Sequence, residues 1–364
     1  MKMGCRYLAG LFALVIFFGC GPAFAEPYLA VRMGLKCATC HVNPTGGGLR
    51  SDFGDLFAQT ELPAHSIKGW GPWTGEVTKF LRVGGNLRYD ANFTQTPDAD
   101  TKHQLAVQQG RVYAEAVAIP DRLLFYVDAQ LTPGTPAKHE AYGLFWSKNH
   151  DWYIKAGQMY LPFGFRFEDQ TAFVYDVSSI TMFSPDYGLE FGWMRGHWDT
   201  QVVVSEGTAA GLLPSTSGKE YGLQASYVES RWRAGVAAHR DDSPFARRKV
   251  VGVFGGLHAG PVDFLGEIDS VQNEFAPLNG ARQAAALLEA DWLIARGNNL
   301  KLTLERLDPN RDVHDNRRTR VSLVYELTPV QFVQVRAGVR DYDGPQGIAS
   351  QNIRLWFIQL HGFF

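Results

Sequence analysis

Residues 300–307 read Leu-Lys-Leu-Thr-Leu-Glu-Arg-Leu, and this short stretch carries the pattern that decides the fold. Apolar and polar side chains alternate along it. Successive side chains of a β-strand point to opposite faces of the sheet. Leu300, Leu302 and Leu304 therefore share one face, and polar side chains occupy most of the other.

Similar segments of about 8 to 15 residues follow one another from about Lys79 to the C-terminus, separated by turn residues. Several of them alternate as cleanly as residues 300–307. We expect sixteen strands, at 79–93, 103–118, 122–131, 139–147, 151–160, 187–194, 198–206, 219–228, 231–239, 248–258, 262–271, 282–295, 300–307, 317–327, 330–341 and 351–364.

The connections between these strands alternate in length. Tight links fall at Pro120-Asp121, Asn149-His150, Gly196-His197, Glu229-Ser230, Gly260-Pro261, Gly297-Asn298 and Thr328-Pro329. Longer connections lie near 94–102, 132–138, 161–186, 207–218, 240–247, 272–281, 308–316 and 342–350. Short turns at one end and long loops at the other are typical of outer-membrane barrels, whereas alternation alone also fits a soluble β-sandwich.

Tryptophans cluster beside the short turns. Trp146 and Trp152 flank one turn, Trp193 and Trp198 flank another, and Trp232 follows a third. A ring of aromatic side chains at the membrane interface produces this placement. Scattered core tryptophans do not predict it.

The chain ends on an alternating strand, with Trp356, Ile358, Leu360 and Phe364 on one face. This ending resembles the C-terminal signal that outer-membrane barrels present to their assembly machinery. We therefore predict an all-β fold, a transmembrane antiparallel β-barrel of about 16 strands over residues 78–364, with fourteen or eighteen strands as alternatives. An even strand count places both termini on the same, periplasmic side.

The N-terminus has the layout of a secretory signal peptide. A positive start precedes an apolar stretch that is too short to span a membrane comfortably. The small-residue pattern ending at Ala25 predicts cleavage before Glu26, so that residues 1–25 are removed. A lipoprotein cysteine at Cys20 is the rival interpretation, and both export the chain. The net charge of −2 gives no indication of nucleic-acid binding.

Residues 37–41 read Cys-Ala-Thr-Cys-His, the attachment pattern of a c-type haem. On one helical turn, Cys37 and Cys40 face the same way and reach the two vinyl groups, while His41 ligates the iron. We expect one haem c, with Cys37 and Cys40 bound covalently and His41 as proximal axial ligand. A redox disulfide expects a βαβ context, and a zinc site needs a second ligand pair; neither is present.

The second axial ligand is less well determined. His65 is the nearest downstream histidine and the first candidate, although it also fits an ordinary loop residue. Met33 is too close to Cys37 to swing easily to the far face, and a ligand farther along the chain, or none, stays open. The glycines at 46–48 predict a turn, and apolar spacing predicts a helix at roughly 50–60.

The haem segment, residues 26–77, is too small to be comfortably stable alone, so we expect it to dock against the rest of the chain. It lies directly before the first strand. The hydrocarbon layer is about 30 Å thick, and one haem can serve both sides only from inside the barrel. We therefore expect this α-helical segment to plug the lumen.

In layout, the mature chain resembles the fused monohaem cytochrome c–porins of the bacterial outer membrane, whose best-studied members are iron-oxidising cytochromes. Residues 157–164, before a long loop, also look like the phosphate-selective porins. The resemblance implies electron transfer across the outer membrane between an extracellular donor or acceptor, such as Fe(II) or another metal ion, and a periplasmic c-type cytochrome. The only highly specific motif that carries this resemblance is residues 37–41. The chain is shorter than expected for the iron oxidisers.

Two other functions stay open. One is a porin that conducts small anions past Arg336 and Arg340, with a structural or sensory haem. The other is the sheath of a larger electron conduit. His361 faces inward by alternation, as a solvated lumen histidine or a haem-site residue. Loop carboxylates are candidates for attracting a metal cation: Asp169, Asp176, Asp241, Asp242, Asp312 and Asp315.

No catalytic constellation appears in the sequence, and enzyme activity would mean oxidation of a metal ion at the haem edge. The direction of electron flow depends on the reduction potential. The potential depends on the distal ligand, which the sequence does not fix.

Overall fold

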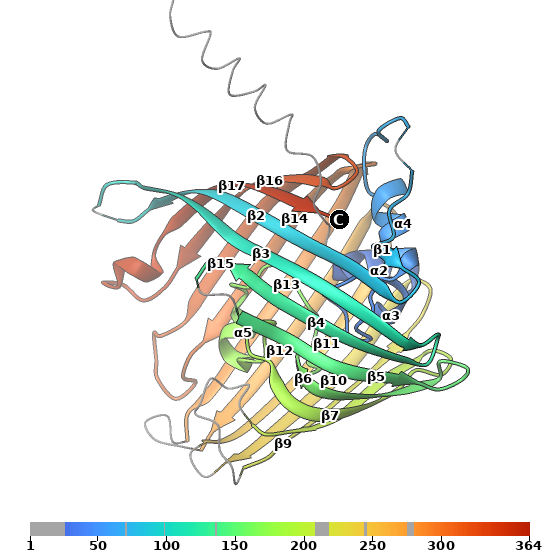
Figure 1. Ribbon diagram of the computed structural model, residues 1–364. Helices are drawn as coiled ribbons and strands as arrows, with labels where there is room; N and C mark the ends of the chain where they lie inside the picture. The colour runs from blue at the N-terminus through green and yellow to red at the C-terminus, as the bar shows by residue number, and fades with distance from the viewer. Residues whose placement is uncertain are drawn as a thin grey trace, which may run out of the picture.

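The computed structural model describes residues 26–69, 71–97, 99–134, 137–207, 218–243, 246–274 and 280–364. The predicted signal peptide, residues 1–25, lies outside the described residues. The described residues form a closed antiparallel β-barrel, with short helices inside it and at one end (Figure 1).

Sixteen long strands among the described residues form the wall, and each pairs with the next along the chain. The pairing of the last strand with β2 closes the cylinder. The short strand β1 (Glu76–Thr78) adds to β2. The wall strands are β2 (Leu81–Gln95), β3 (Lys102–Ile119), β4 (Leu123–Thr132), β5 (Ala137–Trp146), β6 (Trp152–Met159), β7 (Asp186–Trp193), β8 (Trp198–Ser205), β9 (Glu220–Val228), β10 (Trp232–Ser243), β11 (Ala246–Ala259), β12 (Val262–Asn273), β13 (Arg282–Ala295), β14 (Asn298–Asp308), β15 (Arg318–Val330), β16 (Val333–Asp343) and β17 (Arg354–Phe363).

All sixteen predicted strands are confirmed, and so is the alternation of short turns with longer loops. One turn was misplaced. The link expected at Thr328-Pro329 lies instead at Gln331-Phe332, because β15 continues to Val330, which pairs with Val333. Proline is tolerated here because the register is already irregular between Leu327 and Val330.

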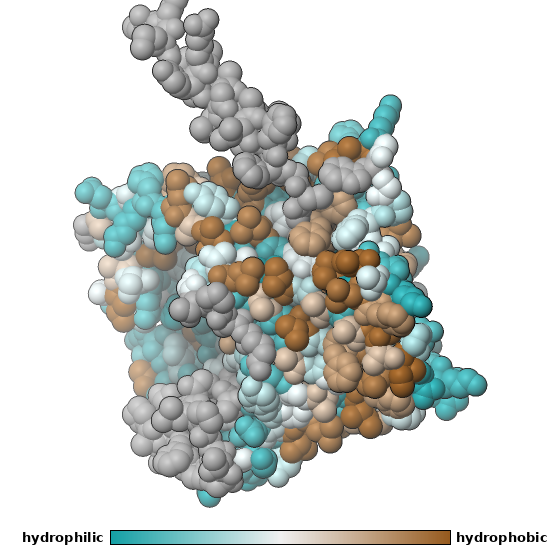
Figure 2. All heavy atoms as spheres, in the orientation of Figure 1, coloured by the Kyte–Doolittle hydropathy of each residue, from teal (hydrophilic) through white to brown (hydrophobic). Residues whose placement is uncertain are grey.

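The barrel is apolar outside and polar inside, the reverse of a soluble protein. On β14, Leu302 is 41% exposed while Lys301 is 6% exposed, and the alternation predicted for residues 300–307 is confirmed. Figure 2 shows apolar side chains gathered over the strands on the visible face. Apolar side chains cover the outer surface of a barrel that faces lipid, and polar groups fill the lumen.

The predicted tryptophan ring is largely confirmed. Trp152 and Trp193 pair directly across β6 and β7, and Trp198 and Trp232 are also exposed near the short turns. Trp146 is the exception. It is half-buried and packs 5.0 Å from the ring of Tyr153, because its register points it into the barrel.

The described helices lie in three regions. Helices α2 (Pro27–Met33), α3 (Cys37–Cys40) and α4 (Asp52–Thr60) belong to the N-terminal segment, and α4 confirms the helix expected at 50–60. Helix α5 (Phe173–Ser178) lies in the loop between β6 and β7, and η1 (Ala349–Gln351) precedes β17. Among the described residues, no helix has both the length and the apolar character to cross a membrane.

The loop at 160–185 does not project outward, as its length suggested. Its helix α5 contacts β12, β13 and β14 on the opposite wall, so the loop crosses the lumen. Asp169, expected among the outer-loop carboxylates, instead binds Arg320 at 2.9 Å and Arg340 at 3.0 Å. These arginines draw the loop inward because they are buried on the lumen wall. We call residues 160–185 the inward loop.

The C-terminal strand ends beside β2 at the short-turn end, where the backbone of Phe364 meets Gly85. Trp356, Ile358 and Leu360 face outward, as predicted. His361 faces inward as expected, but it is buried beside Gln334 rather than solvated.

Candidate functional site

The N-terminal segment, residues 26–69, is fixed to the inner wall from several sides. Arg32 on α2 binds Asp263 of β12 at 2.6 Å. Lys36 donates from Nζ to the carbonyl oxygens of Met194 at 2.6 Å and Trp198 at 2.7 Å, at the turn between β7 and β8. These contacts place α2 and the start of α3 at the short-turn end of the lumen.

A second set of contacts joins the segment to the opposite part of the wall. Asn43 donates from Nδ2 to both carboxylate oxygens of Glu140, at 3.1 and 3.2 Å, and its Oδ1 accepts from Lys155 at 3.3 Å. The backbone amide of Leu49 donates to Tyr126 Oη at 3.2 Å. All three wall residues are buried, and the segment adds to the partners they find within the wall, where Glu140 also accepts from the amide of Tyr160 and Lys155 also pairs with Glu190.

Local hydrogen bonds fix the Cys-Ala-Thr-Cys-His run. Helix α3 is a single turn, and the amide of His41 donates to Cys37 O at 3.0 Å. Ser51 donates from Oγ to Thr39 O at 2.6 Å, and its amide donates to Cys40 O at 3.0 Å. The glycines at 46–48 form the predicted turn, which brings residue 50 back against His41.

The two cysteines are half-buried free thiols, while His41 is only 4% exposed. Burial, and then the charges of Arg50 and Arg166, lower the pKa of His41 to about 3. Its imidazole is therefore neutral near pH 7, which is the form that ligates a metal. Burial, together with neighbouring Cys37, raises the pKa of Cys40 to about 11.

These residues border a cavity inside the barrel with about 1240 Å³ between its walls, counting the part open to solvent. The cavity has three walls. The N-terminal segment supplies Met33, Leu35, Cys37, Cys40, His41 and Phe57; the inward loop supplies Phe165, Arg166, Phe167 and Met182; the strands supply Arg88, Gln109, Gln201, Arg233 and Phe254.

Three arginines, one from each wall, carry buried nitrogen atoms that have no hydrogen-bond partner among the described residues. The atoms are Nη2 of Arg50, Nη1 of Arg166 and Nε of Arg233. An unpartnered buried donor is costly, so three of them around one cavity indicate an anionic group there. Haem carries two propionates, and the residues present therefore fit a c-type haem in both thiol and charge chemistry.

His65 does not lie in this cavity. Its side chain is exposed, and its backbone amide donates to Pro329 O at 3.1 Å, near the turn between β15 and β16. The structure brings together Cys37, Cys40 and His41 but leaves His65 on the surface. His65 was proposed as a ligand because it is close to His41 in the sequence. Its contact with residue 329, which holds it outside the cavity, is not predictable from the sequence.

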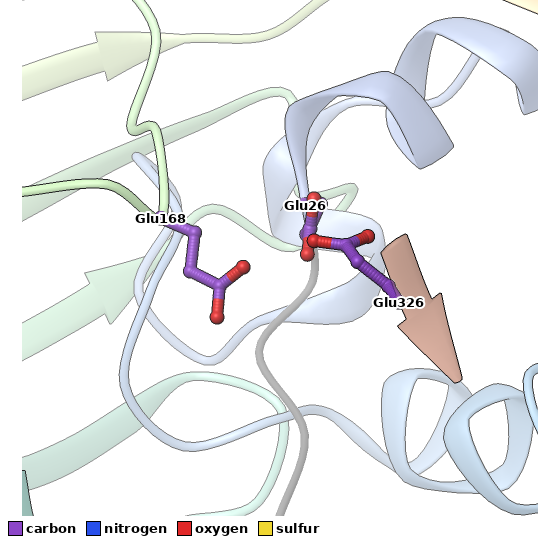
Figure 3. A group of neighbouring side chains, drawn as sticks. All are labelled: Glu26, Glu168 and Glu326. Carbon is purple, nitrogen blue, oxygen red and sulfur yellow. The ribbon is translucent and has the colours of Figure 1, made fainter. Parts of the chain in front are cut away.

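Three buried carboxylates meet near the start of α2, where Figure 3 shows Glu26, Glu168 and Glu326 close together. Basic side chains already pair with these carboxylates. Glu26 contacts Lys301, and Arg336 binds both Glu168 at 3.2 Å and Glu326 at 3.0 Å. The cluster is an ion-pair network that joins the segment, the inward loop and the wall.

The other predicted loop carboxylates form no metal-binding group among the described residues. Asp242 pairs with Arg240 at 2.6 Å, and Asp312 pairs with Arg282 at 2.5 Å, both exposed. The sequence also gave no indication of Arg166 and Met182 as cavity residues. The only available signal was the unusual length of the loop that carries them.

Several solved structures share this fold, among them an outer-membrane protein and an anion-selective porin. The anion-selective porin of Comamonas acidovorans matches with a TM-score of 0.61 and 11% identity, covering 78% of this chain and 99% of the porin. OmpT of Vibrio cholerae matches with a TM-score of 0.60 and 11% identity, covering 78% and 99%. OprB of Pseudomonas putida matches with a TM-score of 0.60 and 10% identity, covering 78% and 94%.

These likenesses show the fold: the chain forms a porin-like 16-strand β-barrel. No family model matches the sequence. No curated protein matches it either.

Proposed function

We propose that the protein holds one c-type haem inside an outer-membrane barrel and transfers electrons across the membrane. Its exchange partners are an extracellular donor or acceptor and a periplasmic c-type cytochrome. The observation that carries this proposal is the cavity inside the barrel, which Cys37, Cys40 and His41 border together with three arginines, each with an unpartnered buried donor.

Each group around the cavity has a role in this proposal. The thiols of Cys37 and Cys40 would add across the two vinyl groups of the haem to form thioethers, and the neutral imidazole of His41 would ligate the iron. Arg50, Arg166 and Arg233 neutralise the propionates. When bound, the haem supplies a one-electron redox couple.

Apolar side chains lower the polarity of the cavity. Phe165 and Phe254 pack edge to face with ring centroids 5.1 Å apart, and Phe167 packs 5.7 Å from Phe165. These rings exclude water from the inner wall of the cavity. Burial of this kind tunes a haem potential, together with hydrogen bonds and the axial ligands.

The arrangement of the chain follows from the proposal. Residues 1–25 direct export, residues 26–77 form the haem segment that plugs the lumen, and residues 78–364 form the barrel. Both termini and the short turns are periplasmic, and the long loops lie at the extracellular end, with the inward loop folded into the lumen. The likeness to outer-membrane porins supports this location.

We propose Fe(II) as the extracellular donor, a role that rests on the resemblance to the iron-oxidising cytochromes. The test is a redox titration of the detergent-solubilised protein, followed optically, with Fe(II) then added to the oxidised form. A c-type spectrum with a positive potential and rapid reduction supports the proposal. The control is a Cys37→Ser/Cys40→Ser variant, which we expect to lack the covalent haem spectrum. A negative potential with no reduction by Fe(II) would exclude iron oxidation and favour electron export.

Conduction of small anions is the second candidate function. The likeness to an anion-selective porin favours it. In the structure, however, Arg336 is paired with Glu168, and Arg340 with Asp169, both on the inward loop. Planar-bilayer recording of the intact protein separates the candidates. A porin gives steady anion-selective channels, whereas a plugged electron carrier gives closed or rare ones.

A further inference from the structure

The second axial ligand is one of the main determinants of a haem reduction potential, and the cavity restricts which residues are available for this position. This inference rests on the proposed haem. Apart from Cys37, Cys40 and His41, three residues bordering the cavity have a nitrogen or sulfur atom of the kinds that ligate haem iron: Met33, Lys36 and Met182. No histidine other than His41 borders the cavity in the described part of the chain.

Two of these three are poorly placed. Lys36 already donates from Nζ to two carbonyl oxygens, at 2.6 and 2.7 Å, so its amine is occupied. Met33 borders the cavity but is 38% exposed, so its side chain is partly turned to solvent. It also precedes Cys37 by only four residues, with a left-handed Gly34 between them, and so belongs to the same short piece of chain as the attachment site.

Met182 comes from a different element and is 7% exposed. Its carbonyl oxygen accepts from Arg111 Nη2 at 3.2 Å and contacts His139 Nδ1 at 3.1 Å, both on the buried wall. On either side, Thr181 and Ser184 close a hydrogen-bonded turn, in which the amide of Thr181 donates to Ser184 Oγ at 2.9 Å. These bonds fix the backbone of Met182 on the wall and leave the side chain to the cavity.

The thioether is already close to the haem segment. A Cβ atom at Gly47 would lie 3.5 Å from Met182 Sδ and 3.9 Å from Arg166 Nη1. The same part of the inward loop therefore brings both a sulfur ligand and a cation for a propionate to the segment that carries His41.

We propose that Met182 is the second axial ligand of the haem iron, so that the barrel loop itself completes the iron coordination. Methionine with histidine raises the reduction potential of a haem. The haem would then accept electrons from an extracellular donor and pass them to the periplasmic cytochrome. The inward loop would thus raise the haem potential, which favours acceptance of electrons from an extracellular donor, as well as closing the lumen.

The test compares three variants of the full-length protein: Met182→Leu, Met33→Leu and His65→Gln. Leucine has nearly the volume of methionine, so packing is little changed. We expect Met182→Leu alone to lose the weak red charge-transfer band of a thioether–ferric haem bond and to lower the midpoint potential. The other two variants should keep both properties, and all three should retain covalent haem.

The outcomes separate the two proposals. Loss of the band in Met33→Leu, or its retention in Met182→Leu, overturns the assignment of Met182. A large spectral change in His65→Gln, or a bis-histidine or five-coordinate spectrum in the unmodified protein, also overturns it while leaving the haem in place. Absence of covalent haem from the unmodified protein contradicts the proposed function itself.

Discussion

Arg320 of β15 donates from Nη2 to Asp169 Oδ2 at 2.9 Å, which joins the barrel wall to a loop residue 151 positions earlier in the chain. The same guanidinium binds Glu305 of β14 and the hydroxyl of Tyr342 at 3.1 Å. Its side chain is almost fully buried. The inward loop is therefore held across the lumen by a buried, multiply bonded arginine.

Replacing this arginine should release the loop and destabilise the barrel. In an Arg320→Met variant, Glu305 loses its cation and Asp169 keeps only Arg340. Removing one partner of a buried ion pair costs about 3–5 kcal/mol. The free energy of unfolding by urea, measured for both proteins in liposomes, gives this cost.

Arg354→Met is the matched control for Arg320→Met. Arg354 binds Asp341 at 2.6 Å with both side chains about half exposed. Such a surface pair contributes at most about 1 kcal/mol. Equal costs for the two variants would show that Arg320 does not hold the loop.

Gly34 lets the N-terminal segment approach the turn between β9 and β10. Its φ is +61°, and a Cβ atom there would lie 2.6 Å from Ser230 Cα. Gly34→Ala should therefore displace the segment and increase protease cleavage within residues 26–69. Left-handed backbone costs an alanine about 1–2 kcal/mol, and overpacking adds about 1–3 kcal/mol.

Gly260→Ala separates the two costs of the Gly34 change. Gly260 has a φ of +63°, and a Cβ atom there would meet nothing within 4 Å. It carries the same backbone strain without the clash. Pro261 O, next to it, accepts from Arg32 Nη2 at 3.0 Å, but a Cβ atom at residue 260 would touch no atom of the segment. We expect its protease pattern to match that of the unmodified protein. An unchanged pattern in Gly34→Ala would contradict the close docking of the segment.

Leu302 tests which face of the barrel meets lipid. It is exposed in the middle of β14, where an arginine costs about 2–4 kcal/mol near the bilayer midplane. Leu302→Arg should lower the free energy of unfolding from liposomes by this amount. Val313→Arg, in an exposed loop, should change it by less than about 0.5 kcal/mol. A neutral Leu302→Arg would mean that this face does not contact lipid.

The wall of the barrel could be predicted from sequence because its determinants are local. Alternation along residues 300–307 assigns each side chain to lipid or lumen without knowledge of the rest of the fold. Turn length and the positions of Trp193 and Trp198 then indicate which end of each strand lies at the short-turn end of the barrel. The prediction for Trp146 was wrong because a difference of one residue in strand register moves a side chain to the other face of the sheet.

The interior could not be predicted because its determinants are distant in the chain. The inward loop depends on Asp169 meeting Arg320, and the cavity depends on Arg166 meeting the segment that carries His41. Sequence periodicity does not predict contacts between residues so far apart in the chain. His65 was chosen by its nearness to His41 in sequence, while the structure brings Met182 to the cavity from 141 positions beyond His41.

The most direct test of the central claim is the intact mass of the protein purified from outer membranes, measured with its haem spectrum. The account predicts the mass of residues 26–364 plus one covalently bound haem, lost in Cys37→Ser/Cys40→Ser. A chain of unmodified mass with two free thiols and no haem absorbance would contradict it, and would leave a porin-like barrel with an empty inner cavity.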